Sequence, residues 1–89
     1  MSISKDKLDS TIRRIFAEVF TMQADGAPAP DLAGDTILLN TGMDSLGFAI
    51  LVTMLEEELG FDPFSLSTEA YYPSTYDEFL TFYLGNQPA

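Results

Sequence analysis

The sequence contains no cysteine and no histidine. Without cysteine the chain can neither form a disulfide nor use a thiolate as nucleophile or metal ligand. Without histidine it lacks the side chain that most often serves as a general base near neutral pH, and also the commonest metal ligand. Thiol chemistry and a serine–histidine pair are therefore excluded, and no metal site is expected.

Basic residues are scarce, and they stand at one end of the chain. Four bases, all within residues 5–14, face fourteen acids, and the formal net charge is −10. Asp6 and Asp9 are the only acids before residue 14, so the other twelve follow with no base among them. Such a surface repels nucleic acid and anionic lipid and favours basic partners, although solubility alone also explains an acidic composition.

The chain also lacks long apolar runs. Nothing approaches the roughly 20 consecutive apolar residues of a membrane span, and the N-terminus has no signal-peptide pattern. We therefore expect a soluble, monomeric, cytoplasmic protein without a membrane or nucleic-acid partner. With 89 residues, 46% of them hydrophobic, it should form a single domain over residues 1–89 around one modest core.

Helical periodicity begins near the N-terminus. Residues 4–22 place apolar side chains three and four positions apart, and Ser4 or Asp6 can cap the start. Residues 23–42 contain two prolines and three glycines, which predicts a long loop. The residues expected to attach that loop to the core are Ile37, Leu38 and Leu39. The expected buried face of the first helix is Leu8, Ile12, Ile15, Phe16, Val19 and Met22.

Three further helical segments are predicted. One starts at Asp44 or Ser45 and ends at Leu59, before Gly60; a short helical turn follows, which Pro73 ends. The core residues expected on the first of these are Phe48, Leu51, Val52, Leu55 and Leu59. The last helix starts with a capping box of Thr75 and Glu78, and its expected buried face is Tyr76, Phe79, Leu80 and Tyr83. The prediction is an all-α fold, a small antiparallel bundle of three main helices plus one short helix.

A second apolar strip lies on the other side of the helix over residues 45–59. Leu46, Ile50 and Met54 are spaced four apart, beside Glu57. Either a loop covers this strip, or it is an exposed recognition surface with an acidic rim. Met54 suits such an adaptable contact surface.

Ser45 admits two interpretations. A serine at a helix start is most often a cap. A nucleophilic role has little support, because the chain has no histidine and its only lysines lie in the first helix. The positive end of a helix favours an attached anion by about 0.3–1 kcal/mol, so a serine there is well placed to carry a phosphate ester.

The stretch "GMDSLGFAILVTMLEEELG" resembles the signature of the acyl carrier proteins and related carrier domains. The likeness lies in its setting: an amphipathic helix, a long loop, "DSL" opening the second helix, "LEEELG" closing it, and "PSTYDEFL" opening the last. It extends from about Leu8 to Leu84. The resemblance implies a free-standing carrier protein without catalytic residues of its own.

The resemblance also implies roles for individual residues. Ser45 would carry a 4′-phosphopantetheine arm, attached by a phosphopantetheinyl transferase that uses coenzyme A, and the thiol of the arm would hold an acyl or aminoacyl group as a thioester. Asp44 would help that transferase recognise the site. Leu46 would be the exposed apolar contact for partner enzymes, with Ile50 and Met54 beside it, and Glu57 would belong to the acidic rim.

The chain departs from the carriers of primary fatty acid synthesis, which commonly have acids where Gly47 and Ile50 stand. Modules of non-ribosomal peptide synthesis usually have histidine before the serine, where this chain has Asp44. We therefore expect a carrier for a specialised biosynthetic pathway, loaded by an acyl- or aminoacyl-activating ligase and serving downstream transferase or synthase enzymes. Because its interior is rich in phenylalanine, Phe48 among them, we expect weak sequestration of long chains and a short or polar cargo.

Three alternatives remain open. The chain could be a carrier for primary fatty acid synthesis. It could be an unmodified acidic interaction module that keeps the carrier fold, with Ser45 as a cap only. It could also be an acidic mimic of nucleic acid, although its acids form no regular phosphate-like array.

Overall fold

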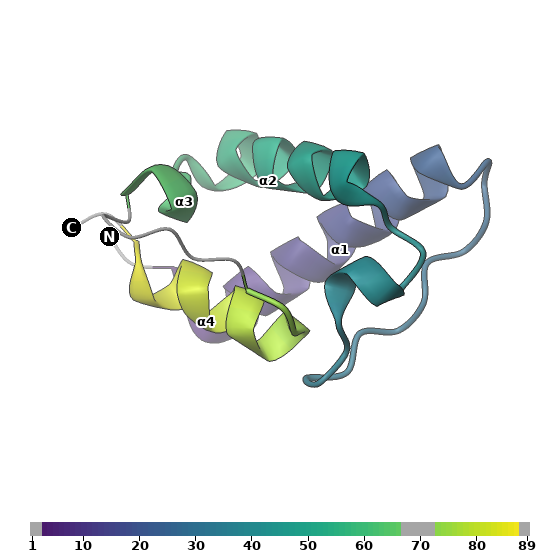
Figure 1. Ribbon diagram of the computed structural model, residues 1–89. Coiled ribbons are helices and arrows are strands. Elements are labelled where there is room, and N and C mark those ends of the chain that lie inside the picture. Colours follow the sequence, from purple (N-terminus) through teal and green to yellow (C-terminus); the bar gives the residue numbers. More distant parts are fainter. Residues whose placement is uncertain (1–2, 67–72, 88–89) are drawn as a thin grey trace.

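The computed structural model describes residues 3–66 and 73–87. In this part of the chain the elements are α1 (Lys5–Gln23), a 3₁₀ turn η1 (Leu38–Asn40), α2 (Ser45–Leu59), α3 (Pro63–Leu66) and α4 (Tyr76–Gly85). α2 and α4 both run against the direction of α1 and pack on it (Figure 1). The predicted small helical bundle, three main helices and a short one, is confirmed. The predicted end of the short helix at Pro73 depends on residues 67–72, outside the described part.

The helices begin and end at the capping residues and the glycine that the sequence predicts. The Ser4 hydroxyl accepts a hydrogen bond from the Lys7 N–H and caps α1. Thr75 and Glu78 form the predicted capping box at the start of α4. Gly60 ends α2 with φ +86°, a left-handed conformation that glycine adopts without steric cost.

The core lies where the three long helices meet. Leu51 and Leu55 of α2 are fully buried against Leu8 and Phe16 of α1 and Phe79 of α4, all in one cluster. Of the residues expected inside on α2, Phe48 and Leu59 are half-buried and pack on this cluster. Val52 is also half-buried and is not part of the cluster, so its assignment to the core was wrong.

Three other assignments to the core were wrong. Met22 is 62% exposed, because it stands in the last turn of α1, beyond Val19 and Phe20, the last residues of this helix that belong to the core or pack on it. In the loop, Leu38 is buried, but Ile37 and Leu39 are 40% and 54% exposed. A 3₁₀ turn spreads consecutive side chains around its axis, so only one of these three neighbours can face the core.

The buried aromatic residue Tyr83 carries an unsatisfied polar group. Its hydroxyl is buried and has no hydrogen-bond partner in the described part of the chain. Burial, together with the charges of Asp62 and Glu56, raises the pKa of Tyr83 above its ordinary value.

We expect Tyr83→Phe to raise the free energy of unfolding by about 1 kcal/mol, because a buried donor without a partner costs roughly that much or more. Urea denaturation of both proteins measures this difference. A loss of stability in Tyr83→Phe would show that the hydroxyl does have a partner in the folded protein.

Candidate functional site

The long loop before α2 is held against the start of α4. The Leu38 N–H donates to the Ser74 carbonyl at 3.1 Å, and the Tyr76 N–H donates to the Thr36 carbonyl at 2.8 Å. The Asp77 N–H donates to the Gly34 carbonyl at 2.9 Å. With Leu38 buried in the core, these bonds fix the path of the loop and therefore the position at which α2 begins.

Asp44, and not Ser45, caps α2. The Gly47 N–H donates to Oδ1 of Asp44 at 2.8 Å, and the Phe48 N–H donates to the Asp44 carbonyl at 3.0 Å. Ser45 is the first residue of the helix, and it is exposed. Within the described residues its hydroxyl makes no hydrogen bond, so it does not contribute to helix capping.

The first turn of α2 also has backbone N–H groups without a hydrogen-bond acceptor among the described residues. The N–H groups of Ser45 and Leu46 find no acceptor in the described part of the chain, as is usual in a first helical turn. Together with the helix dipole they favour a negatively charged group at this point. A phosphate ester on Ser45 therefore fits the local electrostatics.

The second apolar strip of α2, formed by Leu46, Ile50 and Met54, is not evenly exposed. Leu46 is 62% exposed, whereas Ile50 and Met54 are half-buried and pack against the core. The strip is therefore exposed at Leu46 and covered in part at Ile50 and Met54. Leu46 next to Ser45 offers an apolar contact, while Ile50 and Met54 present only their edges.

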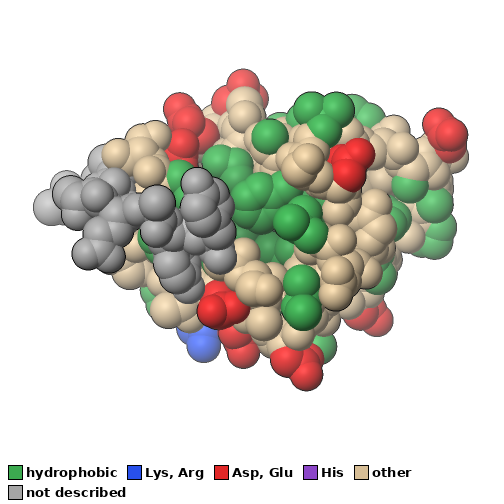
Figure 2. All heavy atoms as spheres, in the orientation of Figure 1, with side chains coloured by type: hydrophobic (Ala, Val, Ile, Leu, Met, Phe, Trp, Pro, Cys, Tyr) green, Lys and Arg blue, Asp and Glu red, His purple; other side chains and the backbone are tan. Residues whose placement is uncertain are grey.

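Acidic residues stand near the far end of α2. Glu57 is exposed and makes no ion pair within the described residues, whereas Glu58 pairs with Arg14 of α1. Arg14 also contacts Glu18, at 3.3 Å. Figure 2 shows acidic side chains around the edge of the face between α2 and α4, and hydrophobic side chains across its middle. The unpaired Glu57 is thus available to a basic partner.

Gly47 has a packing role that the sequence analysis did not find. A Cβ at this position would collide with the side-chain oxygen of Gln23 and would lie 2.9 Å from Cγ of Met43. Because Gly47 has no side chain, Gln23 at the end of α1 can lie against the first turn of α2. No local pattern predicts this contact between residues 24 positions apart.

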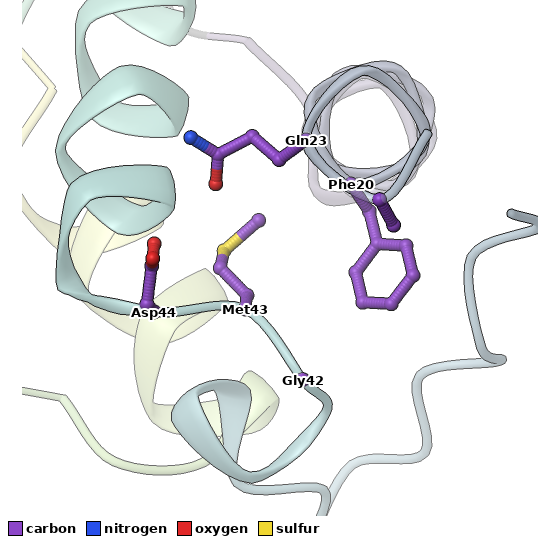
Figure 3. Close-up of a pocket in the computed structure, with 6 residues that line it drawn as sticks. Phe20, Gln23, Gly42, Met43 and Asp44 are labelled. Atoms are coloured by element: carbon purple, nitrogen blue, oxygen red, sulfur yellow. The ribbon is translucent and has the colours of Figure 1, made fainter. Parts of the chain in front are cut away.

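These residues border a cleft of about 270 Å³ between the end of α1 and the start of α2. Figure 3 shows Gln23 reaching across from α1 toward α2, and Met43 between them. The lining residues are Phe20, Gln23, Ala24, Gly42, Met43 and Asp44. The cleft thus includes the residue directly before Ser45.

Within the described residues, no group of acidic side chains is arranged to hold a metal ion. None of the helices described is long and apolar enough to cross a membrane.

Comparison with known proteins bears directly on this site. A family model described as "Phosphopantetheine attachment site" matches residues 10–67, more than half of the chain. The chain belongs to the acyl carrier protein family. Comparisons with curated proteins and with solved structures gave no significant match.

The family relationship settles the general role of the chain. It is a carrier protein with 4′-phosphopantetheine as its covalent cofactor. Carrier proteins of this kind are modified by a transferase, pass their cargo among biosynthetic enzymes, and are generally not catalysts themselves. The matched region contains the loop, the start of α2 and the residues that line the cleft.

Proposed function

We propose that the whole chain is one carrier domain and that Ser45 bears the phosphopantetheine arm. The observation that supports this best is the state of the Ser45 hydroxyl. It is exposed at the first position of α2, and Asp44 supplies the cap that would otherwise occupy it. The thiol of the arm holds an acyl or aminoacyl group as a thioester, and partner enzymes perform the chemistry.

The partner enzymes dock around the start of α2. Asp44 presents its carboxylate to the phosphopantetheinyl transferase, and Leu46 supplies the exposed apolar contact. The edges of Ile50 and Met54 extend this contact along α2, and Glu57 meets basic side chains. Leu39, exposed in the loop before α2, is a further apolar group available to the same partners.

The pathway is a specialised one, with an activating ligase that loads the arm and transferase or synthase enzymes that receive the cargo. Gly47 and Ile50 support this proposal. Carriers of primary fatty acid synthesis commonly have acidic residues at these two positions, which contact basic patches on their enzymes, and neither Gly47 nor Ile50 carries a charge. Gly47 is covered by Gln23, and Ile50 packs on the core. Efficient turnover by the enzymes of primary fatty acid synthesis would instead assign the carrier to that pathway.

The attachment site can be tested with a fluorescent coenzyme A analogue and a broad-specificity phosphopantetheinyl transferase. We expect wild-type apo-protein and Ser10→Ala to become fluorescent, and Ser45→Ala to stay dark. Ser10 is a matched control because it is also an exposed serine in a helix. Equal labelling of Ser45→Ala would place the arm elsewhere.

The two roles of Asp44 can be separated by substitution. Asp44→Asn keeps a side chain that caps well, so its stability should stay within a few tenths of a kcal/mol of wild type, whereas Asp44→Ala should lose about 1 kcal/mol. If the transferase uses the charge, both variants should be labelled at least tenfold more slowly. Labelling of Asp44→Asn at the wild-type rate would limit Asp44 to capping.

A further inference from the structure

Aromatic rings of α2, α3 and α4 lie close to one another between these helices. The centroid of the Phe64 ring lies 6.3 Å from that of Phe48, 6.4 Å from that of Phe79 and 4.8 Å from that of Phe82. Phe79 and Tyr83 stack with their centroids 4.8 Å apart. A cargo entering here would have to displace rings that contact one another, at the cost of their packing.

The cleft between α1 and α2 offers space without such displacement. It has a volume of about 270 Å³, just below the roughly 300 Å³ at which sites for whole small molecules begin. Asp44 lines it (Figure 3), and Ser45 follows Asp44 directly in the chain. A group tethered to Ser45 therefore starts one residue along the chain from the lining of this cleft.

The lining of the cleft suits the chemistry of a pantetheine arm. Phe20 is half-buried and Met43 is buried, and both supply apolar surface. The amide of Gln23 makes no hydrogen bond to any described residue, and it can both donate and accept. A pantetheine arm contains amide groups that match it, between carbon segments that match Phe20 and Met43.

We propose that the end of the arm, with a short thioester cargo, lies in this cleft against Phe20, Gln23 and Met43. This inference rests on the proposed function, since it needs the arm on Ser45. It also gives Gly47 a role in the carrier, because a side chain there would force Gln23 and Met43 to shift, and both residues line the cleft that the arm occupies. The volume limits the cargo to a short chain.

The test uses the full chain loaded with butyryl-phosphopantetheine from butyryl-coenzyme A, with the mass gain verified before any other measurement. Isotope-filtered NMR then detects contacts between the arm and the protein. We expect nuclear Overhauser effects from the arm to the Phe20 ring, the Met43 methyl group and the Gln23 side chain. The signals of Phe64, Phe79 and Tyr83 should keep the positions that they have in the apo-protein.

Two variants and a control test whether the lining of the cleft is responsible for these contacts. Gln23→Ala should load normally and lose at least half of the intensity of the contacts to Phe20. Gly47→Ala should lose them almost entirely. Gly85→Ala is the matched control, because a Cβ at this helical glycine meets no atom within 4 Å, and it should keep them all. If Gly47→Ala does not fold, Gln23→Ala still decides the question.

The outcomes separate the two proposals. No mass gain would overturn the carrier assignment of Ser45 and this inference with it. A mass gain without contacts to the cleft would overturn only the inference. A mass gain with large shifts at Phe64, Phe79 and Tyr83 would also overturn it, and would place the cargo between α2 and α4.

Discussion

Leu55→Ala is expected to lower the free energy of unfolding by about 2–5 kcal/mol, and Leu46→Ala to change it by no more than about 0.5 kcal/mol. Both are leucines of α2, but Leu55 is fully buried between the helices and Leu46 is 62% exposed. Domains of this size are stable by only about 4–13 kcal/mol, so Leu55→Ala removes a large part of the total. Urea denaturation of the two variants beside wild type measures both differences.

The same pair of variants separates folding from docking. If Leu46 is the contact for partner enzymes, Leu46→Ala should raise the KM of the transferase for the folded apo-protein at least fivefold while stability is unchanged. Leu55→Ala should load with the wild-type KM under conditions where it remains folded. If Leu46→Ala lowers the free energy of unfolding, Leu46 is covered in solution. If the KM of the transferase does not change, Leu46 is not part of the docking surface.

Tyr76→Phe is expected to lower the free energy of unfolding by about 1.5–3 kcal/mol at neutral pH, the usual worth of a hydrogen bond to a charged group. The Tyr76 hydroxyl donates to Oδ1 of Asp9 at 2.5 Å, which joins α4 to α1. Arg13 pairs with the same carboxylate at 3.0 Å and lies over the Tyr76 ring, 4.5 Å from its centroid. It also donates to the Leu32 carbonyl at 2.7 Å. The cluster therefore connects both helices to the long loop.

This cluster makes stability depend on pH in a defined direction. The hydrogen bond from Tyr76 lowers the pKa of Asp9 below its ordinary value despite partial burial, and Arg13 adds to the effect. A carboxyl with a lowered folded pKa contributes stability above its unfolded pKa of about 3.9, and this contribution is lost as the pH falls through the folded value. The capping bonds from Thr75 lower the pKa of Glu78 and act in the same direction.

Measuring stability between pH 2 and pH 7 tests the assignment. Wild type should lose stability below about pH 4, and the loss should be smaller in Tyr76→Phe and Asp9→Asn, which lack the bond or the charge. Tyr83→Phe, expected to stabilise the protein, serves as a tyrosine-to-phenylalanine control and should keep the wild-type slope. Identical slopes in all four proteins would exclude Asp9 as a source of acid sensitivity.

Much of the fold could be predicted because it depends on local signals. Apolar spacing of three and four located α1 and α4, and Gly60 and the Thr75–Glu78 capping box marked helix ends that the structure confirms. The wrong assignments concern residues whose burial depends on tertiary packing and not on local sequence. Periodicity assigned Met22 to the buried face, but it cannot show at which residue of a helix the core ends.

The site was predictable only in part, for the same reason. The "DSL" tripeptide located the start of α2, but Asp44 and Ser45 were both possible caps, and only the geometry of the Gly47 N–H decides between them. The sequence suggested that Gly47 marks a change of partner enzymes. Its contact with Gln23 depends on how the end of α1 meets α2, which no pattern in either segment specifies.

The central claim, that this chain carries cargo on an arm at Ser45, is tested most directly by intact mass spectrometry. Folded apo-protein is incubated with butyryl-coenzyme A and a phosphopantetheinyl transferase, and then treated with hydroxylamine. We expect a gain of one butyryl-phosphopantetheine unit, loss of the butyryl group with hydroxylamine, and no gain in Ser45→Ala. A folded wild-type protein that gains no mass would contradict the account and favour an unmodified acidic interaction module with the carrier fold.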